Sequence, residues 1–291
     1  MATTATVRGA STSGGPVQRV AVARVERAIR SAVREPRSSY LQEFAQAFRT
    51  YLSPLTEAQV FSRICTADVV LIGDYHTLAS CQRFTTSLLK KLKAGDPRSI
   101  ALGLEAVYSS SQTVLDEWLP GCARGSALRK SALRNSMAED ELCERIRFKK
   151  DWGYDWEPYR ELFSAARKSC EGVWGLDSEP RFDLRRVRAR DRHMAARIRE
   201  MREVHPQARL LAFVGESHLA PEHLPRLLRE ALPNERVLTV LQNVDSLYWQ
   251  MADGDWIPGA VAVSEDVLCV FNASPLEKYE SYREYLERWR G

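Results

Sequence analysis

The fold is decided by the stretch VVLIGDYH at residues 69–76, in which an apolar run ends at a glycine and an acid, a phenol and an imidazole follow. A similar order of residue types returns in LLAFVGESH at residues 210–218. A short run that is apolar at every position is typical of a parallel strand with both faces covered. The sequence therefore predicts two strands that carry an acid and a histidine to similar places.

Further strands and helices are predicted from the alternation of apolar runs with helical periodicity. Strands are expected at residues 99–104, 173–176 and 236–241, with a hairpin at 259–263 and 267–271. Helices are expected at 78–93, in an Arg-rich segment at 183–203, at 221–231 and after Ser274. This alternation predicts an α/β fold with a mostly parallel central sheet and helices on both faces. A helical insertion at about 110–170 and a C-terminal hairpin and helix would complete it.

Composition and charge indicate an ordinary globular protein. The 291-residue chain is 44% hydrophobic and 27% charged. Its net charge of +4 is uneven, because residues 1–38 hold seven Arg and two Glu, which leaves the remainder close to neutral. We predict a disordered or weakly helical basic tail at 1–38 and a single domain at 39–291 that begins with a helix over 39–64. Nucleic-acid binding is not favoured, since it would depend on the tail or a local patch.

Several classes of protein are disfavoured by what the sequence lacks. The six cysteines form no C-x-x-C pair, and no apolar run reaches the roughly 18 residues that a membrane span needs. The first residues lack the apolar core of a secretory signal. Neither a dinucleotide-binding glycine motif, a P-loop nor a G-x-S-x-G elbow occurs. We therefore expect a cytoplasmic protein with reduced thiols and no membrane span.

Acidic and histidine side chains follow the predicted strands where the strands end. The residues concerned are Asp74, His76, Glu105, Asp177, Glu216 and His218. The carboxyl ends of parallel strands share one rim, which is where open α/β sheets bind ligands. Two imidazoles and a carboxylate suit Zn, Mn, Co or Fe, so His76, Glu105 and His218 form a candidate metal site. In the alternative interpretation, the acids only cap the helices that follow.

Two further features bear on this rim. Asp191 interrupts the apolar stripe of the Arg-rich helix, and a buried acid needs a partner such as a neighbouring arginine or a strand-end histidine. We therefore place Asp191, with Asp177, in a supporting position behind the ligands. The aromatic cluster at residues 152–159 indicates either core packing or a flat apolar wall for a planar ligand, with Trp156 and Tyr159 in that wall.

Five features in this order resemble the ChaN family of haem-binding uptake proteins, which shares a superfamily with the Tiki and TraB proteins and the erythromycin esterases. They are Gly73-x-x-His76, Glu105 after Leu102-Gly103-Leu104, Trp156-x-x-Tyr159, Asp191-x-x-Met194-Ala195 and Gly215-x-x-His218, within about residues 60–245. The resemblance implies an α/β fold with a His/Glu pocket at the edge of the sheet. The sequence departs from typical members in two ways: it has no export signal or lipid-acceptor cysteine near its start, and Asp74 stands where Glu is commoner.

The resemblance implies a haem- or metal-binding protein. In this hypothesis His76 and His218 bind haem iron or a divalent metal, Tyr75 is a phenolate ligand, and Glu105 orients or neutralises the site. The aromatic cluster is the wall of the pocket, and the ligand is haem or another small molecule.

The alternative hypothesis is a metal-dependent peptidase or esterase that uses the same residues. His76, His218 and Glu105 would bind the ion, and Asp74 or Glu216 would act as the general base on a bound water. A third hypothesis is an interaction module that uses the basic tail. The sequence leaves open which of these holds, and whether the chain forms a homodimer.

Overall fold

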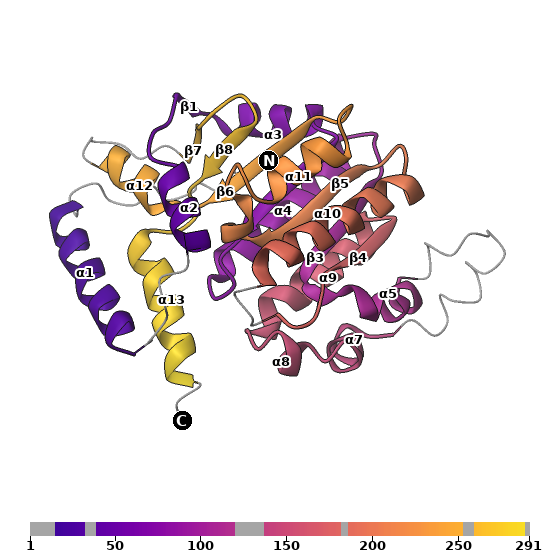
Figure 1. The fold of residues 1–291 in the computed structure, drawn as a ribbon, viewed down its shortest axis with the longest axis horizontal. Helices are drawn as coiled ribbons and strands as arrows, with labels where there is room; N and C mark the ends of the chain where they lie inside the picture. The colour runs from indigo at the N-terminus through magenta and orange to yellow at the C-terminus, as the bar shows by residue number, and fades with distance from the viewer. Residues whose placement is uncertain (1–14, 33–38, 120–136, 182–185, 253–258, 289–291) are drawn as a thin grey trace, which may run out of the picture.

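The computed structural model of the protein describes residues 15–32, 39–119, 137–181, 186–252 and 259–288, and an open eight-stranded sheet forms its centre (Figure 1). In order across the sheet, the strands are β1 (Ser53–Leu55), β7 (Ala260–Ala262), β8 (Val267–Val270), β6 (Val237–Gln242), β2 (Val69–Asp74), β5 (Arg209–Gly215), β3 (Ile100–Tyr108) and β4 (Gly172–Asp177). Six strands run parallel, whereas β7 is antiparallel to both β1 and β8. The predicted α/β fold is confirmed.

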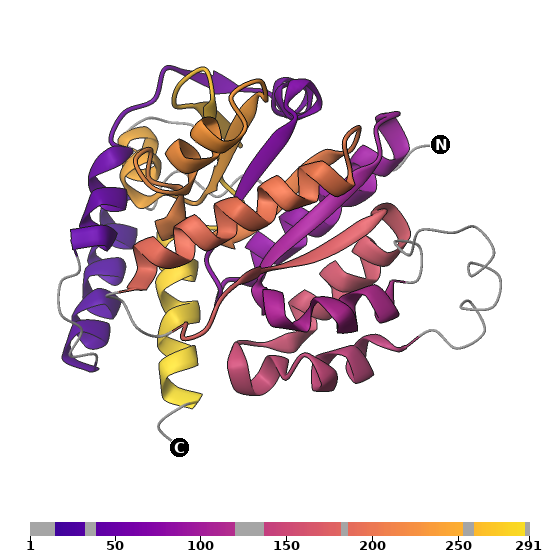
Figure 2. The same ribbon diagram turned by 45° about the vertical axis from the view of Figure 1, so that its right-hand side comes forward.

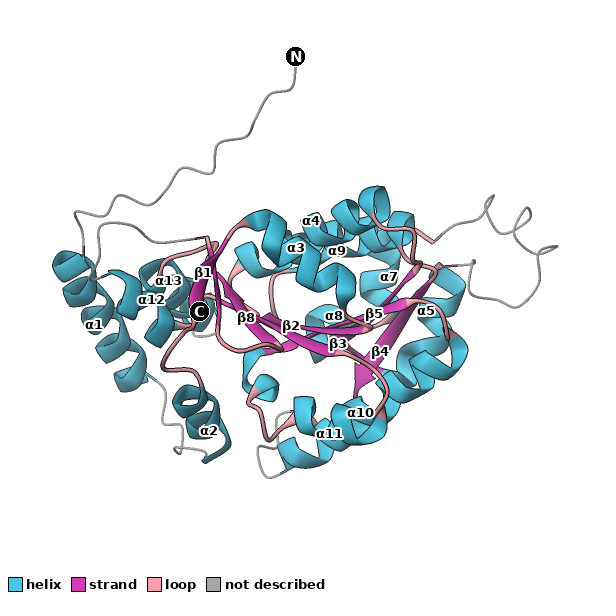
Figure 3. Cartoon of the chain, turned by 90° about the horizontal axis from the view of Figure 1, so that it is seen from above, coloured by secondary structure: helices cyan, strands magenta, loops and turns pink. Residues whose placement is uncertain are grey.

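Helices cover both faces of the sheet, as Figure 3 shows from above. One face packs against α3 (Glu57–Thr66), α4 (Ala79–Gly95), α5 (Gln112–Trp118), α7 (Glu139–Arg145), α8 (Phe148–Asp151) and α9 (Trp156–Ser169). The other face packs against α2 (Ser39–Ala47), α10 (Val187–Val204), α11 (Leu224–Ala231) and α12 (Asp245–Ala252). The two layers enclose two apolar clusters, one on each side of the sheet.

Strand β2 lies near the middle of the sheet, between β5 and β6. Val70 and Ile72 belong to the apolar cluster on the α4 side, and Val69 and Leu71 to the cluster on the α10 side. Side chains alternate between the two faces of a strand, so both faces of β2 must be apolar. This placement explains why the run lacks the polar alternation of a half-exposed strand.

The prediction of one helix over residues 39–64 is wrong. The segment divides into α2, the edge strand β1 and α3. Pro54 lies within β1, where a missing N–H is tolerated because the strand is at the edge of the sheet. Thr56 then starts α3 with a capping box, in which its side chain accepts from the backbone of Gln59 and the Gln59 side chain accepts from the backbone of Thr56. Apolar spacing alone does not detect these interruptions.

Two terminal helices lie next to each other beyond the sheet, as Figure 2 shows. Helix α1 (Gly15–Ala32) lies within the predicted basic tail, and its Val22 and Val25 side chains are buried. Helix α13 (Pro275–Arg288) is the predicted last helix. The rest of that tail, residues 1–14 and 33–38, lies outside the described residues. Within the described ranges, no helix is long and apolar enough to cross a membrane.

The carboxyl end of β3 carries an irregularity that depends on a glycine in β4. Leu104 pairs with Gly175 and Tyr108 with Asp177, so β3 has two more residues than β4 over this stretch. A Cβ on Gly175 would lie 2.4 Å from the carbonyl oxygen of Tyr108. Only a residue without a side chain at position 175 therefore allows the bulged end of β3, which contains Glu105, to lie this close to the backbone of β4.

We expect Gly175→Ala to destabilise the protein by about 1–3 kcal/mol or more, because the added methyl would clash with backbone rather than with a movable side chain. The measurement is the free energy of unfolding in urea. Gly259→Ala is the matched control, since a Cβ at Gly259 meets no atom within 4 Å. Equal stability of the two variants would contradict the proposed close contact.

Candidate functional site

His76 lies just after β2, where Asp74 orients its ring. Nδ1 of His76 is 2.9 Å from Oδ2 of Asp74. The amide of Gln82 donates to Oδ1 of Asp74 at 2.6 Å, and the hydroxyl of Tyr159 donates to Oδ2. A carboxylate held in this way fixes the imidazole so that Nε2 is the nitrogen left for other partners.

Aromatic rings lie against His76. Its ring centroid is 4.4 Å from that of Trp152 and 5.0 Å from that of Tyr154, and Tyr154 stacks on Tyr285 of α13 at 4.7 Å. An adjoining cavity of about 300 Å³ is lined by Gly153, Tyr154, Asp155, Tyr285 and Arg288. The side chain of His76 is 23% exposed, so it can be reached from solvent beside this cavity.

Gly215, at the end of β5, lets His76 and Glu105 approach each other. A Cβ at this position would lie 3.1 Å from Nε2 of His76 and 3.1 Å from Oε2 of Glu105. The backbone N–H of Gly215 also donates to Oε2 of Glu105 at 2.5 Å. In the second sequence unit, the glycine therefore allows His76 and Glu105 to lie close to the backbone of β5.

His218 is buried, and both of its ring nitrogens have partners. Nε2 is 3.2 Å from Oε1 of Glu105, and Nδ1 is 2.5 Å from Oδ1 of Asp191. The hydroxyl of Tyr40, from α2, lies 2.9 Å from both Nδ1 of His218 and Oδ2 of Asp191. The predicted supporting position of Asp191 therefore corresponds to a contact with a strand-end histidine.

Charges around His218 favour its protonated form. Burial alone lowers the pKa of His218, but the charges and hydrogen bonds of Glu105 and Asp191 outweigh burial and raise the pKa to about 9. Burial alone raises the pKa of Glu105, but the charges of His218 and Arg190 hold that pKa well below its usual range. At neutral pH these charges therefore favour an imidazolium at His218, between two carboxylates.

Two arginines complete the buried charge network. Arg190 donates to Oε1 of Glu105 at 2.6 Å and to both carboxylate oxygens of Asp177 at 2.8 and 2.9 Å. Arg181 donates to Oδ2 of Asp177 at 2.7 Å and to the backbone carbonyl of Glu105 at 2.9 Å. Asp177 therefore supports the site through these arginines.

Glu216 faces α13 and pairs with Lys278. Both carboxylate oxygens of Glu216 lie 3.1 Å from Nζ of Lys278, which also lies 4.6 Å from the ring centre of Tyr75. Burial raises the pKa of Glu216, and the charge of Lys278 opposes this rise. Burial likewise raises the pKa of the Tyr75 hydroxyl.

Several predicted positions differ from those in the structure. Trp156 packs on Phe148 and Phe163 and donates to Asp140 at 3.0 Å, so Trp152 is the tryptophan that touches His76. Two of the three remaining histidines are buried. His205 packs against Trp174 and Glu171, and His223 stacks on Tyr40 at 3.8 Å; both are buried.

Sequence reasoning missed several contributors to the site, among them Tyr40, Lys278 and Tyr285. The only sequence signal for the last two is that Lys278, Tyr282 and Tyr285 share one face of α13 at helical spacing. Tyr40 gives no comparable signal, because its partners Asp191 and His218 are more than 150 residues away.

The donor groups do not form a metal-binding cluster in the described part of the chain. Within those ranges, no three His, Cys, Asp or Glu side chains are placed to hold a metal ion. His76 and Glu105 lie beside Gly215. Nε2 of His218 lies 3.2 Å from Oε1 of Glu105, so these two groups pair with each other.

A family model described as haem-binding uptake, Tiki superfamily, ChaN matches residues 60–189. The predicted resemblance to the ChaN family is confirmed. A ChaN protein of Campylobacter jejuni, whose structure is described as cofacial haem binding, is 14% identical to this chain, with 65% of this chain and 86% of that one covered and a TM-score of 0.48. The type III effector HopBA1 is also 14% identical, with 79% and 99% covered and a TM-score of 0.47. No curated protein matches this chain.

The charge pairing of His218 predicts an alkaline loss of stability. Its folded-state pKa of about 9 exceeds the ordinary 6.5, so the pairing contributes fully below pH 6.5 and its contribution is lost as pH rises through about 9. We expect the free energy of unfolding in urea to fall over this range by on the order of 2 kcal/mol. His218→Gln should remove most of that slope.

His205→Gln is the control for this experiment, because it alters a buried histidine at the opposite, amino end of the strands. It should keep the alkaline slope of the unmodified protein. A slope of equal size in His218→Gln and in the unmodified protein would show that another group titrates.

Proposed function

We propose that the protein binds haem at the carboxyl edge of the sheet, where Nε2 of His76 would hold the iron. The observation that carries the proposal is the orientation of His76 by Asp74, beside an aromatic wall and an open cavity. The match of residues 60–189 to a haem-binding family model supports it.

The residues around His76 suit such a ligand. A histidine whose other nitrogen is held by a carboxylate is a common iron ligand, and the carboxylate raises the basicity of the imidazole. Trp152, Tyr154 and Tyr285 offer flat aromatic surface to a macrocycle. Arg288, at the rim of the cavity, offers a positive charge to a carboxylate-bearing ligand. A bound haem would supply the iron, and these residues would orient it and exclude water.

His218 and Glu105 have a different role in this proposal. Both nitrogens of His218 are engaged, so withdrawing Nε2 for a metal would leave the buried Glu105 carboxylate with one partner fewer. We therefore propose that His218 and Glu105 do not bind the ligand but hold the end of β5 at Gly215 in place beside His76. Tyr75 is less suited than His76, because burial favours its neutral phenol over the phenolate that binds iron.

A hydrolase function is not proposed for this site. The mechanism would need a cluster of ligands for an activating ion and a nearby base, with Glu105, Asp74 or Glu216 as candidates. Within the described ranges, these three acids pair with Arg190, His76 and Lys278, respectively, and a general base would have to give up such a pairing.

Titration of haem into the purified protein tests the proposal. We expect a saturable Soret shift, and a loss of at least about tenfold in affinity together with a changed spectrum in His76→Ala, because this variant removes the imidazole that would hold the iron. His205→Gln should bind as the unmodified protein does. Absence of a saturable shift in the unmodified protein, or an unchanged spectrum in His76→Ala, would overturn the assignment.

Asp74→Asn tests the orienting carboxylate separately. The amide keeps the size of the side chain but removes the charge, so we expect haem affinity to fall about tenfold with His76 still in place. Asp116→Asn, at an exposed position of α5, is the matched control. If both variants bind with equal affinity, Asp74 does not position the ligand.

A further inference from the structure

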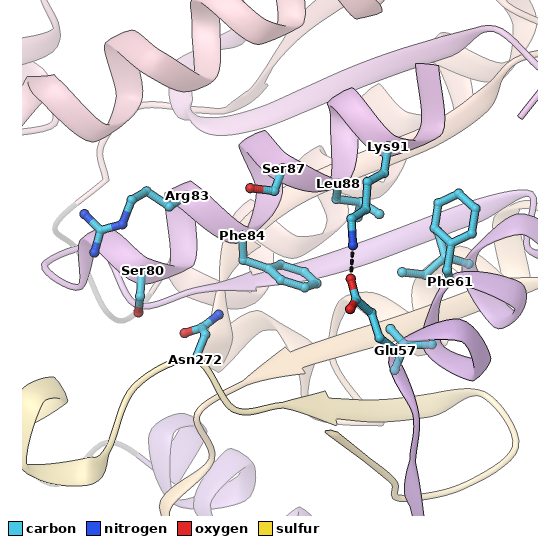
Figure 4. Close-up of a pocket in the computed structure, with 11 residues that line it drawn as sticks. Glu57, Phe61, Ser80, Arg83, Phe84, Ser87, Leu88, Lys91 and Asn272 are labelled. Carbon is cyan, nitrogen blue, oxygen red and sulfur yellow. Dashed lines mark hydrogen bonds and ion pairs between the residues drawn. The ribbon is translucent and has the colours of Figure 1, made fainter. Parts of the chain in front are cut away.

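A second cavity, of about 370 Å³, lies on the α4 side of the sheet, between α3 and α4 (Figure 4). Its walls are mainly apolar, with the rings of Phe61 and Phe84 and the side chain of Leu88 facing the space. A mostly apolar groove of this size with a few polar groups is typical of a site for a small organic ligand. None of its lining residues belongs to the His76 site.

Most polar groups of this groove lie toward its two ends, with Ser87 between them. Ser80, Arg83 and Asn272 lie at one end, and the ion pair of Glu57 with Lys91 lies toward the other, between Leu88 and Phe61 (Figure 4). The second end is therefore already neutralised within the protein. Phe84 lies between the two ends, so a ligand along the groove would have its body against an aromatic face.

The end with Arg83 offers unused hydrogen-bonding capacity. Among the described carboxylates, none pairs with the guanidinium of Arg83, which lines the groove. The hydroxyl oxygen of Ser80 is buried and has no hydrogen-bond partner within the described residues. An unpartnered buried hydroxyl is uncommon, because desolvating it without a bond is costly. A guanidinium and a hydroxyl at the same end of a groove suit a carboxylate, which can accept from both.

The position of this end in the sheet supports a ligand site. Ser80 and Arg83 belong to the first turns of α4, which follows β2, and Asn272 follows β8. From β2 the chain proceeds through α4 to β3 on one side, whereas from β6 it proceeds to β7 and β8 on the other. Open α/β sheets bind ligands at the carboxyl ends of strands where the connections diverge in this way.

We propose that this groove binds a small amphipathic carboxylate, with the carboxylate at Arg83 and Ser80 and an aromatic or acyl body along Phe84, Leu88 and Phe61. The site is separate from haem binding at His76. The positive charge of Arg83 selects the anion, and the apolar walls select its body.

Isothermal titration of the full chain with naphthalene-2-carboxylate tests this proposal. We expect saturable one-site binding, at least tenfold weaker binding of the uncharged naphthalene-2-methanol, and about a tenfold loss of carboxylate affinity in Arg83→Gln. Lys90→Gln is the matched control, because Lys90 is an exposed cation of the same helix that does not line the groove. It should bind as the unmodified protein does.

His76→Ala separates this site from the haem site and should leave naphthalene-2-carboxylate binding unchanged. The proposal would be overturned by no saturable binding, by equal affinity for the acid and the alcohol, or by equal losses in Arg83→Gln and Lys90→Gln. Loss of binding in His76→Ala would place the carboxylate at the His76 cavity and overturn the groove assignment. Failure of haem binding alone would leave the groove unaffected.

Discussion

The ion pair between Arg190 and Glu105 is the interaction on which the carboxyl edge of the sheet depends. Arg190 comes from α10, and its guanidinium joins the end of β3 at Glu105 to the end of β4 at Asp177. These groups are almost fully buried, so each charge must be matched by its neighbours. Removing one partner would leave an uncompensated charge in the interior, which is far more costly than never burying the pair.

This network also explains why the two histidines at the edge differ. His218 lies within the network and carries a charge that Glu105 and Asp191 require. His76 lies outside it and depends on Asp74, which also has neutral partners in Gln82 and Tyr159. A ligand could engage Nε2 of His76 without breaking a buried ion pair, whereas engaging His218 would disturb several.

The sequence was sufficient to predict most of the strands and the residues that follow them. Runs that are apolar at every position are a local signal, and β2 and β5 begin and end within one residue of the two runs and the glycines that end them. The short edge strand β1 was missed because a strand of three residues, one of them Pro54, is too short to show an apolar run or an alternation of apolar and polar residues. The partners of the site residues were harder to predict, because Tyr40 and Lys278 reach them from helices distant in sequence.

The two similar sequence units have different surroundings because they are not aligned in the sheet. Asp74 pairs in register with Gly215, so the glycine of the second unit lies opposite the acid of the first. Side chains alternate between faces, so a shift by one residue sends corresponding side chains to opposite sides of the sheet. Asp74 meets Tyr159 of α9 on one side, and His218, in the 3-10 turn that follows β5, meets Asp191 of α10 on the other. Gly215 lies beside both the imidazole of His76 and the carboxylate of Glu105, and the absence of a side chain leaves room for these two groups. Similar sequence units thus place their histidines in different surroundings: the side chain of His76 is 23% exposed, whereas His218 is buried between two carboxylates.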